Sequence, residues 1–109
     1  MLKKTEKLLY EKQAVILKAL AHPIRIAILD FLDAGPKCVC EIADHVGAER
    51  SNVSRHLAVM VNAGILSFEK KGLEVVYQVK MPCAMRFFGC ITECIKQVAR
   101  ENEKLLRAL

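Results

Sequence analysis

Two short amphipathic patterns meet at a glycine near the middle of the chain, and this arrangement strongly limits the possible folds. The first pattern has the i, i+3, i+4, i+7 apolar spacing of a one-sided helix and stops at Gly47, and the second continues to Gly64. The apolar positions are Val39, Ile42, Ala43 and Val46 in the first pattern, and Val53, Leu57, Met60 and Val61 in the second. Two helices joined by a short turn that contains glycine predict a helix-turn-helix over residues 39–64.

Three further helices are expected around this motif. Residues 5–20 have an apolar face, with Thr5 as the expected cap. A second helix is expected to start at His22-Pro23 and to end at Gly35-Pro36, because proline suits a first helical turn and also fixes a sharp stop. A long last helix is expected from Cys83 to about Leu106, where apolar residues again recur at helical spacing.

A β-hairpin is predicted directly after the motif. The segments Ile65–Lys70 and Glu74–Lys80 alternate apolar and polar residues around Lys71-Gly72-Leu73. A helix-turn-helix followed by a hairpin is a winged helix, so the fold class is mainly α with a small β-hairpin. The whole chain, residues 1–109, is expected to form one winged helix-turn-helix domain. Its parts are two dimerisation helices (1–20 and 83–109), the motif (39–64) and the wing (65–80).

Composition limits the class of protein. Seventeen lysines and arginines against twelve acidic residues give a net charge of +5, which suits an anionic partner without requiring one. No run approaches the roughly 18 apolar residues of a membrane helix, and the lysine-rich start lacks the apolar region of a signal peptide. A cytoplasmic protein with no membrane partner is therefore expected. In that compartment five cysteines favour thiol or metal chemistry over a disulfide framework.

The first and last helices carry more apolar surface than so small a monomer could cover. A homodimer through these two helices is the expected arrangement, because a two-fold protein matches a palindromic operator. The alternative is that both helices fold back on their own subunit.

The second helix of the motif begins with side chains suited to nucleic acid. Short hydroxyl and amide groups together with arginine are the groups that contact phosphates and base edges. An interaction module that binds another protein would not need this set. The candidate DNA-binding residues are Arg50, Ser51, Asn52, Ser54, Arg55 and His56 in the helix, and Lys70 and Lys71 in the wing.

Cys38 and Cys40 lie where an extended segment becomes the first motif helix. Residues two apart point to nearly opposite sides of a helix but share a side of an extended segment, so a shared ion would favour an unwound first turn. The helix N-terminus should stabilise the thiolate form, which is the form that binds soft ions. The alternative reading is that both cysteines are small apolar fillers.

Cys83, Cys90 and Cys94 follow one stripe of the last helix, together with Phe87. They could supply a further metal ligand, form their own three-thiol site, or pack without chemistry. The five thiols could also act as a redox switch or hold an iron–sulfur cluster, although the spacing matches no familiar cluster pattern. No catalytic residues are predicted, because no nucleophile, base and oxyanion-hole set can be identified. The chain is therefore not expected to be an enzyme.

Four sequence segments resemble the ArsR/SmtB family of metal-sensing repressors, and the resemblance covers about residues 14–80. They are Ala19–Arg25 (ALAHPIR), Ser54–Leu57 (SRHL), Ala63–Leu66 (AGIL) and Cys38–Ile42 (CVCEI). The last segment is the most specific and resembles the arsenite-sensing branch. The resemblance implies a homodimeric winged-helix repressor that leaves double-stranded operator DNA when a thiophilic ion binds. The implied effector is As(III) or Sb(III), with Cd(II) or Pb(II) next, and no organic cofactor.

The sequence departs from the family pattern at three places. Arsenic sensors often have a third cysteine three residues after the pair, where this chain has Ala43. A third thiolate would then come from the C-terminal set, with Cys83 or Cys90 expected first, from the same or the other subunit. The last helix has no histidine or aspartate, which argues against the zinc-sensing branch. Glu49 replaces the small residue that usually caps the recognition helix.

Overall fold

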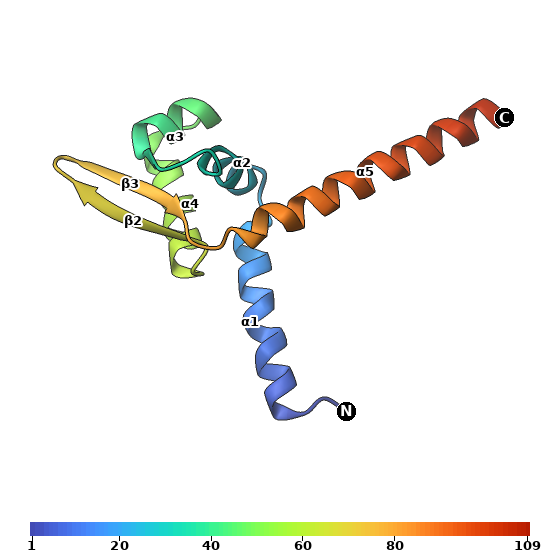
Figure 1. Cartoon of the computed structure of the whole chain (residues 1–109), viewed down its shortest axis with the longest axis horizontal. Coiled ribbons are helices and arrows are strands. Elements are labelled where there is room, and N and C mark those ends of the chain that lie inside the picture. The colour runs from blue at the N-terminus through green and yellow to red at the C-terminus, as the bar shows by residue number, and fades with distance from the viewer.

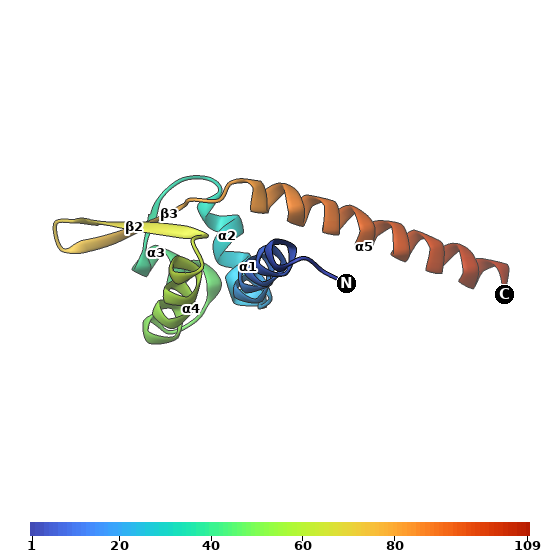
Figure 2. The ribbon, with the colours of Figure 1, turned by 90° about the horizontal axis from the view of Figure 1, so that it is seen from below.

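A computed structural model describes residues 1–109 and contains five helices and three strands. Figure 1 shows a central body formed by about residues 21–82, called the head here, from which the first and the last helix project in different directions. Figure 2 shows the hairpin leaving one side of this head and the last helix leaving the other. The elements are α1 (Lys4–Leu20), α2 (Pro23–Leu32), β1 (Lys37–Cys38), α3 (Val39–Val46), α4 (Arg50–Asn62), β2 (Leu66–Lys71), β3 (Glu74–Val79) and α5 (Cys83–Ala108).

The helix-turn-helix is α3 followed by α4, as predicted. Gly47 ends α3 in the left-handed region at φ 68°, which glycine adopts without strain, and its N–H donates to the carbonyl of Ala43 over 3.0 Å. Glu49 precedes α4, and its side chain makes no capping hydrogen bond. The two helices pack against each other, and α4 also packs against α2.

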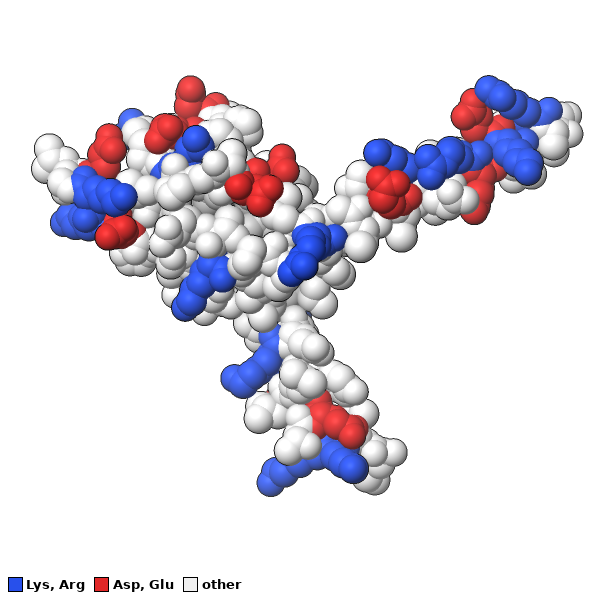
Figure 3. Space-filling view, viewed as in Figure 1, with Lys and Arg blue, Asp and Glu red and all other residues white.

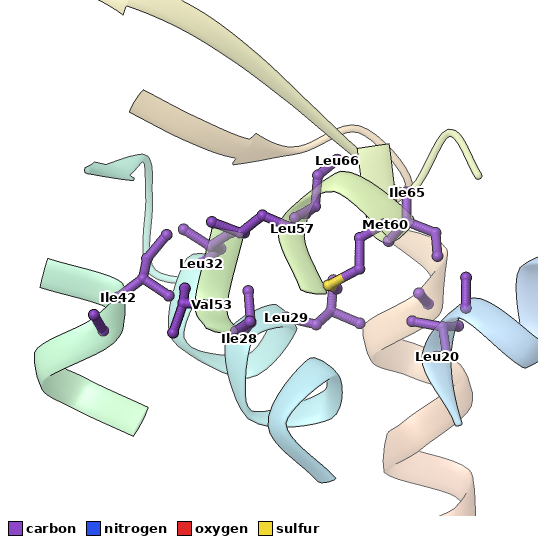
Figure 4. Close-up of a cluster of buried hydrophobic side chains, with 13 residues drawn as sticks. Leu20, Ile28, Leu29, Leu32, Ile42, Val53, Leu57, Met60, Ile65 and Leu66 are labelled. Atoms are coloured by element: carbon purple, nitrogen blue, oxygen red, sulfur yellow. The ribbon is translucent and has the colours of Figure 1, made fainter. Parts of the chain in front are cut away.

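The core lies between α2, α3, α4 and the base of the hairpin. The side chains of Ile28 and Leu29 from α2 converge on Leu57 and Met60 from α4, and all four are fully buried (Figure 4). Burying a side chain of this size stabilises the fold by about 1.5–3 kcal/mol. The core therefore fixes α4 to the head through one face and leaves its opposite face free.

The wing is part of a sheet with strand order β1-β3-β2, in which both pairings are antiparallel. The predicted hairpin is confirmed, with a tighter turn: Lys71 still belongs to β2, and Gly72 takes a positive φ of 64° in the turn. The short strand β1 was not predicted, because it exists only through its pairing of Lys37 with Tyr77 and of Cys38 with Val76. Cys38 is thereby held by the sheet as well as by α3.

The start of α1 differs from the prediction, whereas the start of α2 at His22-Pro23 is confirmed. α1 begins at Lys4, and the N–H of Lys3 donates to the Glu6 carboxylate over 3.4 Å, so Thr5 is not the cap. α2 is capped by His22, whose Nδ1 accepts the N–H of Ile24 over 3.1 Å. Pro23 occupies the first turn, as predicted.

α5 packs against the head only near its N-terminal end. Only Ala84 among its residues is buried, although its sequence places apolar residues at helical spacing along its length. Along the projecting part, Ile95 is 64% exposed and Val98 is 54% exposed. None of the helices has the length and apolar character needed to cross a bilayer.

Candidate functional site

Cys38 and Cys40 come together at the first turn of α3. Their Sγ atoms lie 2.9 Å apart, and both cysteines are free thiols. Cys38 is the residue before the helix and has an extended backbone (φ −81°, ψ 163°), whereas Cys40 lies inside the first turn. Cys38 thus directs its side chain towards its neighbour from an extended residue while α3 stays regular from Val39, and the expectation that a bound ion favours an unwound first turn stays a prediction.

Glu41 caps this helix start. The N–H of Cys38 donates to the Glu41 carboxylate over 3.1 Å. This hydrogen bond favours the charged carboxylate and holds the pKa of Glu41 below its usual value. The Glu41 carboxylate is thus engaged with Cys38, first through the backbone N–H and also through the side chain.

The Cys38 thiol is a weaker acid than the sequence suggested. The hydrogen bond with Cys40, helped by burial, raises the pKa of Cys38 to about 11. We expected the helix N-terminus to stabilise its thiolate, but in this geometry the neighbouring thiol and the buried position outweigh that effect. An ion that binds here must therefore displace the thiol proton.

Glu74 is the third group at the pair, and it was not among the predicted site residues. Its carboxylate and the two Sγ atoms all lie within 4.8 Å of one another. Cys38 is buried, Cys40 is half-buried and Glu74 is exposed. The carboxylate of Glu74 makes no ion pair and no side-chain hydrogen bond. The site therefore has a protected thiol side and an open carboxylate side.

The C-terminal cysteines lie elsewhere in this chain. Cys83, Cys90 and Cys94 are exposed on α5, and none of them joins a three-ligand group with the pair or with the other two. Ala43, at the position where arsenic sensors often have a third cysteine, is buried in the core. A C-terminal ligand supplied by another subunit stays a prediction.

The N-terminal half of α4 presents most of the predicted DNA-binding residues to solvent. Arg50, Ser51, Ser54 and Arg55 are exposed, while Asn52 is half-buried and accepts a hydrogen bond from the Arg55 guanidinium over 3.2 Å. The buried face of the same helix is formed by Val53, Leu57 and Met60. In Figure 3 basic groups are spread over the wing and both projecting helices, among acidic ones, rather than gathered in one patch.

The two wing lysines and His56 differ in their surroundings. Lys70 and Lys71 are exposed, and Lys71 lies 3.9 Å from the carboxylate of Glu69. His56 is half-buried, and its Nδ1 accepts a hydrogen bond from Nε of Arg25 over 3.0 Å. This bond joins α4 to α2, and the expected contact of His56 with DNA stays a prediction.

Comparison with known proteins places the chain in a family. A profile described as "Bacterial regulatory protein, arsR family" matches residues 22–67. The uncharacterized HTH-type transcriptional regulator Rv0081 of Mycobacterium tuberculosis is 30% identical over 93% of this chain and 90% of its own length. This chain belongs to the ArsR family. It is a member of a regulatory family and not of an enzyme family, as predicted.

Solved structures share the fold of this chain. The crystal structure of Rv0081 matches with a TM-score of 0.75 and 30% identity, over 86% of this chain and 95% of that one. A homodimeric winged helix-turn-helix domain from Mycobacterium bovis, Mb0332, matches with a TM-score of 0.79 over 92% and 93% of the two chains. Its identity is 23%, so this likeness concerns the fold alone. An arsenical resistance operon repressor from Staphylococcus xylosus is 32% identical over 63% of this chain and 66% of its own length.

Proposed function

We propose that this ArsR-family protein is a dimeric transcriptional repressor that leaves its operator when a thiophilic ion binds Cys38 and Cys40. The single observation that carries the proposal is the 2.9 Å approach of the two Sγ atoms at the start of the helix-turn-helix. Two thiols at this separation can bind one ion together after a small side-chain rotation. The relative named as an arsenical resistance repressor supports the same class of effector.

DNA binding is proposed for the free face of α4 and for the wing. Recognition helices of this motif place their N-terminal residues at base edges in the major groove. On this face Ser54 and Arg55 are the leading candidates for base contacts, with Arg50, Ser51 and Asn52 beside them. Lys70 and Lys71 at the wing are proposed to contact phosphates.

The dimer is proposed to form through α1 and α5. Both helices project from the head and carry exposed apolar side chains, such as Leu9 and Leu17 on α1 and Ile91 and Ile95 on α5. Covering these side chains with a second copy would remove their apolar surface from water. Two copies related by a two-fold axis would then present two α4 helices to two half-sites.

Induction is proposed to act through the position of α4. The cysteine pair begins α3, and α3 packs directly against α4. Two recognition helices must match half-sites about 34–36 Å apart to bind together. An ion that shifts this spacing with a coupling of about 1–3 kcal/mol would lower operator affinity roughly 5–150-fold.

The proposed effectors are soft ions. Thiolates select such ions, which makes As(III) or Sb(III) the first candidates and Cd(II) or Pb(II) the next. As(III) takes three sulfur ligands, so the two thiols of one chain leave one position to be filled. Cys83 or Cys90 of the other subunit is the thiol proposed for that position.

The test uses the full chain bound to labelled DNA from its own promoter. Arsenite, antimonite, Cd(II), Pb(II), Zn(II) and an oxidant are titrated separately while DNA release is followed by fluorescence anisotropy. The Cys38→Ser, Cys40→Ser double variant should bind DNA like the wild type but stay bound when arsenite or Cd(II) is added. A variant that still releases DNA at wild-type ion concentrations would show that the site is wrong. Release by oxidant alone would instead identify a thiol-redox regulator.

A further inference from the structure

Glu74 lies beside the thiol pair, and its side chain makes no hydrogen bond and no ion pair within the chain. It lies at the first residue of β3, immediately after the hairpin turn, and its side chain is exposed. Its carboxylate reaches within 4.8 Å of both Sγ atoms, although thirty-four residues separate it from Cys40 in the numbering (74 − 40). We propose that Glu74 supplies the third ligand to an ion held by Cys38 and Cys40, which moves the divalent ions Cd(II) and Pb(II) ahead of As(III) among the proposed effectors.

The sheet register makes this approach a fixed feature of the fold. Cys38 pairs with Val76 across the antiparallel β1 and β3 strands. Glu74 is two residues from Val76, and residues two apart share a face of a strand, so Glu74 and Cys38 lie on the same face. Because β1 and β3 are antiparallel, the step forward along the chain from Cys38 to Cys40 runs in the same direction as the step backward along β3 from Val76 to Glu74. All three ligand atoms are therefore brought together by strand pairing and not by a flexible loop.

The donor set matches a divalent ion better than a trivalent arsenic centre. Two thiolates and one carboxylate carry three negative charges, so a bound divalent ion leaves one net negative charge at the site. Three protein ligands with one open position is an arrangement that zinc-type ions accept, with metal–sulfur distances near about 2.3 Å and metal–oxygen distances of about 2.0–2.2 Å. As(III) needs three sulfur ligands, and this site supplies only two, because its third donor is the carboxylate oxygen of Glu74.

Binding of the ion releases protons from the two thiols. The ion displaces one proton from the thiol of Cys38 and one from that of Cys40, and both protons leave to solvent. The Glu74 carboxylate contributes an oxygen lone pair and releases no proton if it is already ionised. In a tetrahedral site the two sulfurs would stand about 3.8 Å apart, given a metal–sulfur distance of about 2.3 Å. The present 2.9 Å separation must then widen slightly as the ion enters.

This ligand would connect the ion to the wing. β3 pairs with β2 along the whole hairpin, and Glu74 is directly opposite Lys71. An ion held by both α3 and β3 would fix the wing relative to the helix-turn-helix and draw the Glu74 charge away from the basic wing tip. The inference rests on the proposed function, because it assigns the third ligand of the same site.

The test measures binding of cadmium chloride to the full-length chain without DNA. Thiolate–Cd(II) charge-transfer absorption reports sulfur ligation, and competition with a chelator gives the affinity. Glu74→Gln should keep the absorption band but weaken Cd(II) binding by about 10–100-fold. Glu69→Gln is the matched control, because it removes one exposed carboxylate from the same hairpin outside the ligand group, and it should leave the affinity unchanged. Glu74→Cys should strengthen arsenite binding, since it supplies a third sulfur.

The outcomes separate this inference from the proposed function. Wild-type Cd(II) affinity in Glu74→Gln, with binding lost in Cys38→Ser, Cys40→Ser, would overturn the role of Glu74 and keep the cysteine site. Wild-type affinity in the double cysteine variant would overturn the proposed effector site itself. The triple variant Cys83→Ser, Cys90→Ser, Cys94→Ser should bind Cd(II) like the wild type, and a large loss there would assign the third ligand to α5 instead. Circular dichroism checks that each variant is folded.

Discussion

The Nε–H of Arg25 donates a hydrogen bond to Nδ1 of His56 over 3.0 Å. The same guanidinium reaches the carbonyls of Lys18 and Ala19 through Nη1, over 3.4 and 3.5 Å. One side chain of α2 is thus connected to the end of α1 and to the middle of α4. These bonds tie the proposed recognition helix to a helix of the proposed dimer interface.

The Arg25–His56 bond predicts a loss of stability in mild acid. Burial, together with the charges of His22 and Arg25, lowers the pKa of His56 from its ordinary value of 6.5. As the pH falls below 6.5, His56 therefore binds a proton more readily in the unfolded chain than in the folded chain. The free energy of unfolding should decrease from about pH 6.5 downward through the lowered pKa of the folded state. Urea unfolding at pH 7.5 and pH 5 measures the change.

A matched pair of variants isolates this histidine. His56→Asn keeps a hydrogen-bond acceptor for Arg25 but cannot take up the proton, so its free energy of unfolding should fall less between the two pH values. His45→Asn removes a histidine that stacks on Phe31 outside this network and is the control for the loss of an imidazole ring. Equal pH dependence in wild type and His56→Asn would contradict the assignment.

Leu57 should be one of the most sensitive core positions. It is fully buried between α2 and the hairpin base, so Leu57→Ala leaves a cavity and should lower the free energy of unfolding by about 2–5 kcal/mol. Leu73→Ala makes the same chemical change at a fully exposed turn position and should alter stability by less than about 0.5 kcal/mol. Denaturant titration at one fixed protein concentration compares the two, because a dimer links stability to concentration.

Gly47 and Gly89 should respond in opposite directions to alanine. An added Cβ would meet no atom within 4 Å at either position, so backbone conformation alone decides the result. Gly47 has a φ of 68°, and alanine there should cost about 1–2 kcal/mol of stability. Gly89 lies inside α5, where alanine should stabilise the chain by about 0.5–1 kcal/mol. Thermal unfolding of both variants provides the comparison, and equal shifts would contradict it.

Arg55 and Lys70 should affect DNA binding in different ways. If Arg55 reads a base, Arg55→Ala should cost about 1–3 kcal/mol of operator affinity and relax the choice of sequence at one position. Lys70→Ala should weaken binding to all DNA sequences alike. It should also lower the slope of log binding constant against log salt concentration by about 1. Anisotropy titrations with operator and with unrelated DNA, at several salt concentrations, distinguish the two effects. Unchanged affinity in a folded Arg55→Ala, Ser54→Ala protein would overturn the proposed DNA-binding face.

The helices could be predicted closely because their signals are local. α3 has the predicted bounds, since apolar spacing fixes its face and Gly47 fixes its end. The start of α1 was harder to place, because the choice between Thr5 and Lys3 as the cap depends on which N–H the Glu6 side chain reaches. A backbone N–H at a helix start can be satisfied by several nearby side chains, and sequence spacing does not rank them.

The site was only half predictable, because one half depends on pairing between distant segments. The Cys38–Cys40 pair is visible in the sequence as two cysteines beside a helix start. The approach of Glu74 follows from the register of β1 with β3, and a strand of two residues leaves no periodicity to detect. The inward position of His56 likewise depends on Arg25, thirty-one residues away in the chain.

Position 38 combines three tasks, and only a substitution that keeps the size of the side chain, such as Cys38→Ser, separates them. Cys38 pairs with Val76 in the sheet, begins α3 and contributes its Sγ to the thiol pair, and its side chain is only 5% exposed. Glu74 is exposed and bonds to nothing through its side chain. Random mutagenesis at position 38 would therefore confound folding with sensing, whereas a library at position 74 would sample donor chemistry on an intact scaffold. A biosensor with altered ion preference should therefore be sought among substitutions of Glu74.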